Sequence, residues 1–553
     1  MVQIPVDGGS LKEGVVGMPT LVNPVLALSD ADKDLTAVVY SGLMRKEPDG
    51  TFIPDLAQSY TVSPNGMTYT FTLKPNATFQ DGTPVTADDV VFTINKIQDP
   101  LIKSPRALGW NGITVSQTDS HTVVFTLKQP YISFMDNTTI GILPSHLWKD
   151  LSDTEFGLSS LNTKAIGSGP FQIDSISKNT DGTPDVYTLK RFPNFVLGTP
   201  HIKMLTIISY ANEKSMIDAL THHSIDQASS ISPENAPAIE KAGYVIHTAT
   251  LPRIFGLFFN SANNKLLADK TVVHAFNIAL DRPQIVNEVL NGYGSVVYSP
   301  IPTTILPSDT PADGHSDSVA GFGKDLDITE ANTMLDNAGW KVGPDGIRQK
   351  GGGTTTTTQT KKVGKKTVKQ TVTVSNGPLV KLSFTITTGD TPELKAASFL
   401  IKEQLIKIGV NVDVKVYGTG ELNSLIRSRS YEALFFGQIV NHESDLYSFW
   451  HSSQVLDPGL NIAMYKNPKV DAILQNAQKT LDQTTRLASY AGFVSQFYQD
   501  LPALLVYSPK YLYATSSNLT NIDLDTVTTP SDRFANIYMW YAQSDHVWKI
   551  FTK

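Results

Sequence analysis

The chain contains no cysteine. This absence excludes disulfide bonds, thiol nucleophiles and cysteine-ligated metal sites together. It does not assign a compartment, because exported bacterial proteins need no disulfides. No apolar run reaches the ~18 to 20 residues of a membrane-spanning helix. The opening MVQIPVDGGSLKEG also lacks the basic and then apolar pattern of a signal peptide. We therefore expect either a cytosolic protein or one whose export segment was removed before Met1.

Surplus positive charge and the common catalytic motifs are also missing. The net charge is -7 and the pI is near 5.9, so the chain lacks the basic footprint of a nucleic-acid binder. It contains no G-x-S-x-G elbow, HExxH helix, G-x-x-x-x-G-K-[ST] loop or G-x-G-x-x-G turn. We expect no nucleic-acid partner, no metal or other cofactor, and no enzyme activity. At 553 residues, the chain is too long for one ordinary core.

The first half is typical of strands and turns with a few helices. Tyr69, Phe71 and Leu73 alternate as in a half-buried strand. Thr86, followed three residues later by Asp89, indicates a capped helix start.

The second half predicts longer helices alternating with strands. Thr391 and Pro392 begin a helical pattern that ends at Gly409, and alternating valines then indicate a strand over 410–416. A second helix and strand follow, the strand being YEALFFGQIV. This order indicates an α/β fold, in which ligands bind beyond strand ends.

The segment 346–378 is rich in glycine, threonine and lysine and cannot bury a core. Its later part alternates around Asn376-Gly377, a hairpin turn signal. We interpret it as a flexible flap or protruding hairpin inserted in a domain, either a solvated excursion or one whose lysines touch an anionic surface.

Several stretches resemble the family 5 extracellular solute-binding proteins, the peptide receptors of ABC importers. The resemblance covers most of the chain. Its most specific parts are YSGLMRKEPDGTFIPDLAQSYTVSPNGMTYTFTLKPNATFQDGTPVTADDVVFTINKI and LFFNSANNKLLADKTVVHAFNIALDRPQIVNEVLNGYG. IGSGPFQI, MIDALTHHSIDQA, DITEANTMLDNAGW and LIKEQLIKIGVNVDV resemble further segments of that family in the same order.

The resemblance implies an α/β, two-lobed periplasmic-binding-protein-like fold, the large three-domain form of type II, with a hinge and a central ligand cleft. The hinge crossovers are expected near 251–256 and 501–508. The implied parts are lobe I at 1–42, 166–252 and 503–553, an inserted second domain at 43–165, and lobe II at 253–502 containing the insert at 346–378.

The resemblance also implies a function. The protein would capture peptides by hinge closure outside the cytoplasm, at the membrane face or in the periplasm, and deliver them to a membrane permease of an ABC transporter. We expect a monomer, anchored by a lipid or a helix. The alternatives are another solute, such as an oligosaccharide, a metal chelate or haem, and a surface adhesin.

The polar segment after YEALFFGQIV is the principal candidate site. Peptide receptors of the family usually hold the ligand's α-ammonium with an aspartate in W-x-x-D-Y-x-x-P, and here His442 stands at that position. Glu443 or Asp445 could bind the ammonium instead. Alternatively, the ligand has no free amino terminus and meets neutral groups of Gln438 and His442, or the segment, which includes Asn441, is a solvated loop.

A metal site of His442, Glu443 and His451 is disfavoured, because the spacing matches no standard motif. Arg282 is expected to form a structural ion pair, and His222 and His223 to lie at an exposed helix end. The resemblance suggests further ligand contacts in other segments: Asn23, Trp110, Ser229, Ser230, Ser232 and Asn260.

Overall fold

The computed structural model describes residues 2–131, 133–303, 305–306, 325–363, 366–375 and 377–547. The chain divides into two compact units. Unit 1 comprises Met1–Pro252 and Lys510–Lys553, and unit 2 comprises Arg253–Pro509. The chain thus passes between them twice, and unit 1 is built from two separate stretches of sequence. A separate domain at 43–165 within unit 1 stays a prediction.

The main sheet of unit 1 is built around β2 (Ser10–Val16). This strand pairs in parallel with β11 (Met204–Tyr210) on one side and with β12 (Gln227–Ser229) on the other. β10 (Pro184–Arg191) and β9 (Phe171–Lys178) extend the sheet beyond β11 with antiparallel pairing. On the other side, the end of β24 (Ala503–Ser516) pairs with β12 and with β13 (Tyr244–Thr250).

A four-stranded antiparallel sheet occupies the middle of the 43–165 segment, in the order β5-β6-β8-β7. The alternation expected around Phe71 is confirmed as β6 (Thr68–Leu73), in which Phe71 and Leu73 are buried. The helix expected after Thr86 is confirmed as α2 (Ala87–Gln98), and Thr86 and Asp89 form its capping box. The other strands of this sheet are β5 (Ala57–Val62), β7 (Ile113–Asp119) and β8 (Thr122–Leu127).

Short helices and small strand pairs complete unit 1 around one continuous apolar core. These elements are β1 (Val2–Pro5), α1 (Asp30–Val39), β3 (Met44–Lys46), β4 (Phe52–Pro54), η1 (Ala107–Trp110), α3 (Phe134–Asn137), α4 (Ser145–Trp148), α5 (Asp153–Phe156), η2 (Ser160–Asn162), α6 (Glu213–Thr221), η3 (Pro233–Asn235), α7 (Ala236–Lys241), η6 (Pro530–Phe534), η7 (Ile537–Met539) and β25 (Ser544–Val547).

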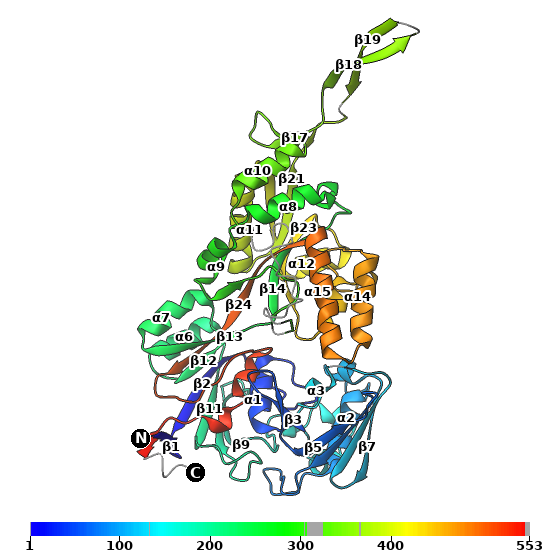
Figure 1. The fold of residues 1–553 in the computed structure, drawn as a ribbon. Helices are drawn as coiled ribbons and strands as arrows, with labels where there is room; N and C mark the ends of the chain where they lie inside the picture. The colour runs from blue at the N-terminus through cyan, green and yellow to red at the C-terminus, as the bar shows by residue number, and fades with distance from the viewer. Residues whose placement is uncertain are drawn as a thin grey trace. The chain divides into compact units, whose positions relative to one another are not determined.

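Unit 2 contains a mixed sheet in the order β22-β21-β23-β14-β24 (Figure 1). β21 (Ser383–Gly389) runs parallel to β22 (Asn411–Tyr417) and to β23 (Ala433–Ile439). β14 (Arg253–Phe259) pairs antiparallel with β23 on one edge and with the start of β24 on the other. The polar candidate segment therefore follows a strand with a neighbour on each side.

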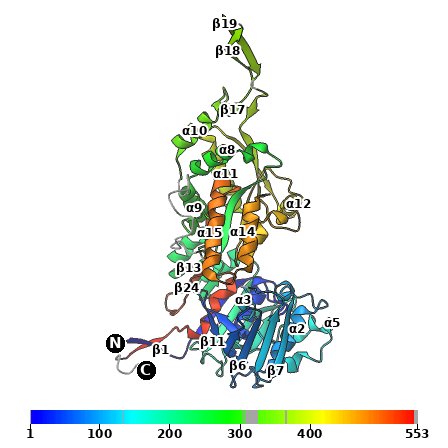
Figure 2. The ribbon, with the colours of Figure 1, turned by 45° about the vertical axis from the view of Figure 1, so that its right-hand side comes forward.

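Helices cover this sheet and enclose the core of unit 2. The expected helix after Thr391 is confirmed as α11 (Pro392–Ile406), and Gly409, with φ +77°, follows its end. α14 (Pro468–Lys479) and α15 (Gln483–Asp500) lie side by side (Figures 1 and 2). The other elements are η4 (Lys265–Ala268), α8 (Lys270–Ala279), α9 (Arg282–Leu290), β15 (Gly294–Val296), α10 (Ile328–Asn337), β16 (Lys341–Val342), β17 (Arg348–Lys350), β20 (Val380–Lys381), α12 (Thr419–Ser428), α13 (Asp445–Trp450) and η5 (Ser452–Gln454).

The 346–378 segment forms a long hairpin of β18 (Thr354–Val363) and β19 (Lys366–Ser375). The expected hairpin is present, but its expected turn at Asn376-Gly377 is wrong. Thr354 pairs with Ser375 and Val363 with Lys366, so the chain reverses between Val363 and Lys366. Asn376 itself is outside the described residues. The threonines, which favour extended backbone, form a strand instead of a loop.

Among the described residues, no helix combines the length and the apolar character needed to cross a bilayer.

Candidate functional site

The loop between β23 and α13 is held closed by one carboxylate. Asp445 Oδ2 accepts hydrogen bonds from the backbone N–H groups of Asn441 and His442, each at 2.9 Å. The backbone N–H of Asp445 in turn donates to the carbonyl oxygen of His442 at 3.0 Å. The loop thus has a fixed shape, because the acceptor oxygen satisfies two donors that follow the strand end.

Glu443 forms an ion pair with Arg486 of α15. Arg486 Nε donates to Glu443 Oε2 at 2.5 Å, and Nη2 donates to Oε1 at 3.3 Å. The Arg486 side chain is 6% exposed, and its Nη1 also donates to the carbonyls of Thr480 and Leu481. A carboxylate that already holds a buried cation is poorly placed to bind a ligand's ammonium as well.

Two amide side chains in this segment contain buried polar atoms without a hydrogen-bond partner among the described residues. These atoms are Nε2 of Gln438, on β23, and Oδ1 of Asn441, two residues beyond the strand end. Gln438 is 4% exposed. A buried polar atom left unsatisfied costs about 1–3 kcal/mol, so such atoms normally meet water or a ligand. One amide donor and one amide acceptor are therefore left for an outside partner.

Sequence reasoning missed two neighbouring side chains on the same sheet. Arg253 on β14 pairs across the strands with Ile439, and its Nε is buried without a partner in the described part of the chain. Tyr507 on β24 has an equally unpartnered hydroxyl, and its ring stacks on Phe255 at 5.1 Å. Burial, and secondarily the charge of Glu393, raises the pKa of Tyr507. Nothing in the local sequence assigns either residue to a binding site.

Asn260 lies at the other end of β14 from the loop. Phe259 pairs with Ala433 at the start of β23, whereas the loop follows Ile439, the last residue of β23. Asn260 is buried, and its Nδ2 donates to the carbonyl oxygen of Arg429 at 2.9 Å. The structure therefore does not bring Asn260 together with the loop. The hydrogen bond of Asn260 to Arg429 instead stabilises the turn before β23.

The three serines lie at and just after β12 in unit 1. Ser229 is buried in the strand, and Ser230 is exposed with φ +56°. Ser232 donates from Oγ to Glu213 Oε2 at 2.6 Å, and its N–H donates to Oε1 at 2.7 Å. The neighbouring Gln227, which sequence reasoning missed, is fully buried, and both polar atoms of its side chain lack a partner among the described residues.

Asn23 and Trp110 are both buried inside unit 1. Asn23 donates to Asn162 Oδ1 at 3.0 Å and accepts from the N–H of Val25 at 2.9 Å. The Trp110 ring is 2% exposed and packs against Phe125 and Phe134 at centroid distances of 5.8 and 6.1 Å. The contacts seen for both residues are internal, and their ligand-binding roles stay predictions.

In the described ranges, no group of three or more histidine, aspartate or glutamate side chains is arranged to hold a metal ion. Nδ1 of His451 interacts with Ser453 at 2.8 Å and Nε2 with Gln475 at 2.9 Å. Arg282 pairs with Asp325 at 2.5 Å, as expected of a structural residue.

Unit 1 contains a buried cluster of charged residues that local sequence patterns do not predict. Arg533 donates to Glu13 and, through two nitrogens at 2.8 Å, to Asp34. Tyr513 donates to the other oxygen of Glu13. Burial outweighs the attraction of Arg533 and raises the pKa of Glu13 to about 7.

Comparison with known proteins identifies the family. The family model "Bacterial extracellular solute-binding proteins, family 5 Middle" matches residues 51–459. The oligopeptide-binding protein AppA of Bacillus subtilis is 27% identical, covering 97% of this chain and 92% of AppA.

Solved structures of similar proteins match this chain over nearly its whole length. The AppA structure in complex with a nonapeptide has a TM-score of 0.66 at 25% identity, with 97% of this chain and 99% of that chain covered. The substrate-binding protein CtaP of Listeria monocytogenes has a TM-score of 0.76 at 24% identity, with 97% and 100% covered. This chain therefore belongs to the bacterial extracellular solute-binding proteins of family 5, which have the two-lobed α/β fold.

Proposed function

We propose that this protein captures oligopeptides outside the cytoplasm and delivers them to the membrane permease of an ABC importer. Proteins of the family are binding receptors and not enzymes. The similarity to AppA, an oligopeptide-binding protein, supports peptides as the solute. The fold alone does not choose among solutes, so the argument depends on the residues after β23.

The observation that carries the proposal is a pair of amide atoms, at Gln438 and Asn441, without a partner among the described residues. A peptide group offers one N–H and one C=O whatever its side chain, and these complement one acceptor and one donor. Glu443 is paired with Arg486, and Asp445 Oδ2 closes the loop. We therefore propose that Gln438, Asn441 and His442 hydrogen-bond to the peptide main chain, without a carboxylate clamp for its amino terminus.

The test uses Gln438→Leu, with Asn423→Leu, an exposed amide on α12, as the matched control. Peptides released from gently purified protein would be sequenced by mass spectrometry and resynthesised with free and acetylated amino termini. Because Gln438 Nε2 has no internal partner, the leucine should leave the free energy of unfolding almost unchanged. Peptide affinity, measured by calorimetry, should fall by about tenfold, corresponding to ~1.4 kcal/mol.

Acetylated and free peptides should bind with similar affinity. Strong preference for the free amine would show that a carboxylate of Glu443 or Asp445 binds the ammonium. The proposal that no carboxylate holds the amino terminus would then be wrong. Release of a glycan, a chelate or haem instead of peptides would assign another solute. The expectations that the protein is a monomer, binds no nucleic acid and is anchored at the membrane stay predictions.

A further inference from the structure

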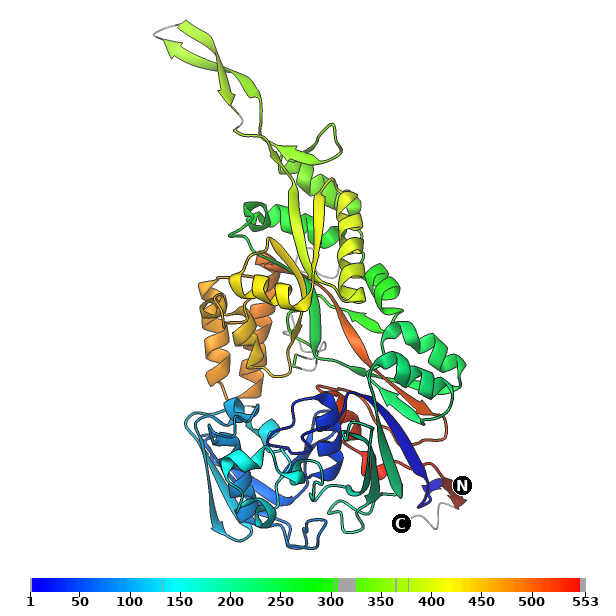
Figure 3. The same cartoon turned by 180° about the vertical axis from the view of Figure 1, so that it is seen from behind.

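The β18–β19 hairpin is a sheet of its own. Its strands pair with each other over ten residues each and with no other described strand. Figures 1 and 3 show it standing away from the rest of unit 2. At its base, β17 and β20 pair with each other, Gln349 opposite Lys381. An isolated two-stranded hairpin buries little, so core packing does not account for this one.

Lysines occupy the end of this hairpin in a regular way. Each of the last four cross-strand pairs contains one lysine, in the order Thr360 with Lys369, Lys361 with Val368, Lys362 with Thr367, and Val363 with Lys366. Successive pairs alternate between the two faces of a ribbon, so each face receives two lysines. The four lysine positions are thus divided evenly between the two faces of the hairpin.

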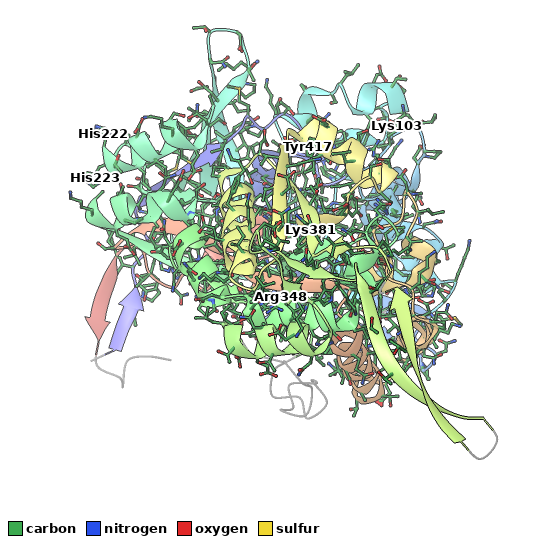
Figure 4. All side chains as sticks on the ribbon, turned by 90° about the horizontal axis from the view of Figure 1, so that it is seen from above. Lys103, His222, His223, Arg348, Lys381 and Tyr417 are labelled. Atoms are coloured by element: carbon green, nitrogen blue, oxygen red, sulfur yellow. The ribbon has the colours of Figure 1, made fainter. Side chains whose placement is uncertain are left out.

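Two cations at the base of the hairpin have carboxylate partners. Arg348 pairs with Asp336 at 2.9 Å and Lys381 with Asp345 at 2.5 Å, and Figure 4 labels both cations. The sequence contains no aspartate or glutamate from 346 to 389. No carboxylate of the hairpin itself is therefore available to offset the tip lysines.

The rest of the molecule has the opposite charge. The whole chain carries a net charge of -7, so removing the four tip lysines leaves -11. A negatively charged surface would repel most of the protein and attract the tip, and this attraction acts within a Debye length, about 10 Å at moderate salt. The charge distribution therefore favours end-on contact with an anionic layer.

We propose that the tip formed by Lys361, Lys362, Lys366 and Lys369, here called the tip lysines, docks on anionic phospholipid headgroups. A headgroup layer surrounds an inserted tip on every side, which suits lysines on both faces of a ribbon, whereas a flat protein partner would need them on one. Such contact would hold the receptor at the membrane containing its permease. It goes beyond the proposed function and does not depend on which solute is bound.

The experiment compares vesicle binding by three full-length proteins. The tip variant replaces the four tip lysines by glutamine. The control variant has the same net charge and replaces four exposed lysines elsewhere: Lys149, Lys178, Lys241 and Lys415. Binding is measured by co-sedimentation with phosphatidylcholine vesicles, with and without phosphatidylglycerol, at low and high salt.

Wild-type binding should require phosphatidylglycerol and should weaken with salt. A lysine near an anionic membrane contributes about fivefold in affinity, so the tip variant should lose well over tenfold. The control variant should stay within about threefold of wild type. Peptide binding by the tip variant, measured in parallel, should be unchanged, so a failure of the docking proposal is separable from a failure of the proposed function.

Three results would overturn the proposal. Equal losses in both variants would indicate a general charge effect. Unchanged vesicle binding by the tip variant, together with increased self-association, would show that the lysines only protect exposed strand edges. Tighter binding of soluble poly(glycerol phosphate) than of vesicles, with loss in the tip variant, would assign a wall-type polyanion instead of lipid.

Discussion

Arg486 on α15 and Glu443 in the loop after β23 form an ion pair with an Nε to Oε2 distance of 2.5 Å. Arg486 belongs to a helix and Glu443 to a loop, and they meet beside the candidate site. Glu443 is the first carboxylate after β23, and its pairing with Arg486 joins the loop to α15.

Glu443→Gln should destabilise the protein, because it leaves the Arg486 side chain, which is only 6% exposed, without its counterion. We expect a loss of ~2 kcal/mol in the free energy of unfolding, measured by urea denaturation. The control is Glu421→Gln, an exposed glutamate on α12, which should change the free energy by less than about 0.5 kcal/mol. Equal effects of the two substitutions would show that the pair does not hold the loop.

Asp445→Ala removes the oxygen that accepts from the N–H groups of Asn441 and His442. The loop should loosen, with a loss of ~1–2 kcal/mol in stability and about tenfold in peptide affinity. Asp445→Asn retains an acceptor oxygen, so its effects should be smaller. If the asparagine variant instead loses affinity only for peptides with a free amine, Asp445 binds the ammonium through its charge. Urea denaturation and calorimetry together distinguish the two cases.

The raised pKa of Glu13 predicts a pH dependence of stability. Its pKa is about 7 in the folded protein and near 4.5 ordinarily, so the folded state binds the proton more tightly than the unfolded state. Stability should therefore fall as the pH rises from about 4.5 to 7. Glu13→Gln removes this titration, and the difference between the variant and wild type should change by ~3 kcal/mol across that window.

The raised pKa of Asp34 contributes to the pH dependence of stability in both wild type and Glu13→Gln, so its contribution largely cancels in the difference between them. Glu421→Gln should instead follow the wild-type pH profile. Parallel profiles for wild type and Glu13→Gln would contradict the assignment of this titration to Glu13.

Gly256→Ala should disturb the centre of the unit 2 sheet. A Cβ added there would lie 2.8 Å from the carbonyl oxygen of Leu504 on the neighbouring strand, and backbone cannot move aside as a side chain can. We expect a loss of ~1–3 kcal/mol, measured by thermal or urea unfolding. Gly420→Ala on α12, where an added Cβ meets nothing within 4 Å, should be neutral or stabilising. Equal stability of the two variants would contradict the close approach at Gly256.

Local signals predicted local structure well. Thr86 with Asp89 and Thr391 with Pro392 predicted where α2 and α11 begin, because a cap and the first turn are only a few residues apart. The buried strand before the candidate loop was predicted from its continuous apolar run and is β23.

Contacts between distant residues were not predictable in the same way. Arg486 is 43 residues from Glu443, and no spacing rule connects them. The hairpin reversal was misplaced because Asn376-Gly377 is a strong turn signal, whereas the pairing of β18 with β19 depends on the match of two whole strands. The sequence located the candidate site by the strand that precedes it. Only the structure shows that Glu443 is paired with Arg486 and that Asp445 accepts hydrogen bonds from the loop backbone.

The division of unit 1 between both ends of the chain has a consequence for synthesis. Glu13 and Asp34 are synthesised about 500 residues before Arg533, their buried cation. The end of β24, which closes the sheet beside β12, follows the whole of unit 2 in the chain. Until then the first carboxylates have no counterion and the sheet has an open edge. Unit 1 therefore cannot complete its fold until the whole of unit 2 and the segment after it have been synthesised.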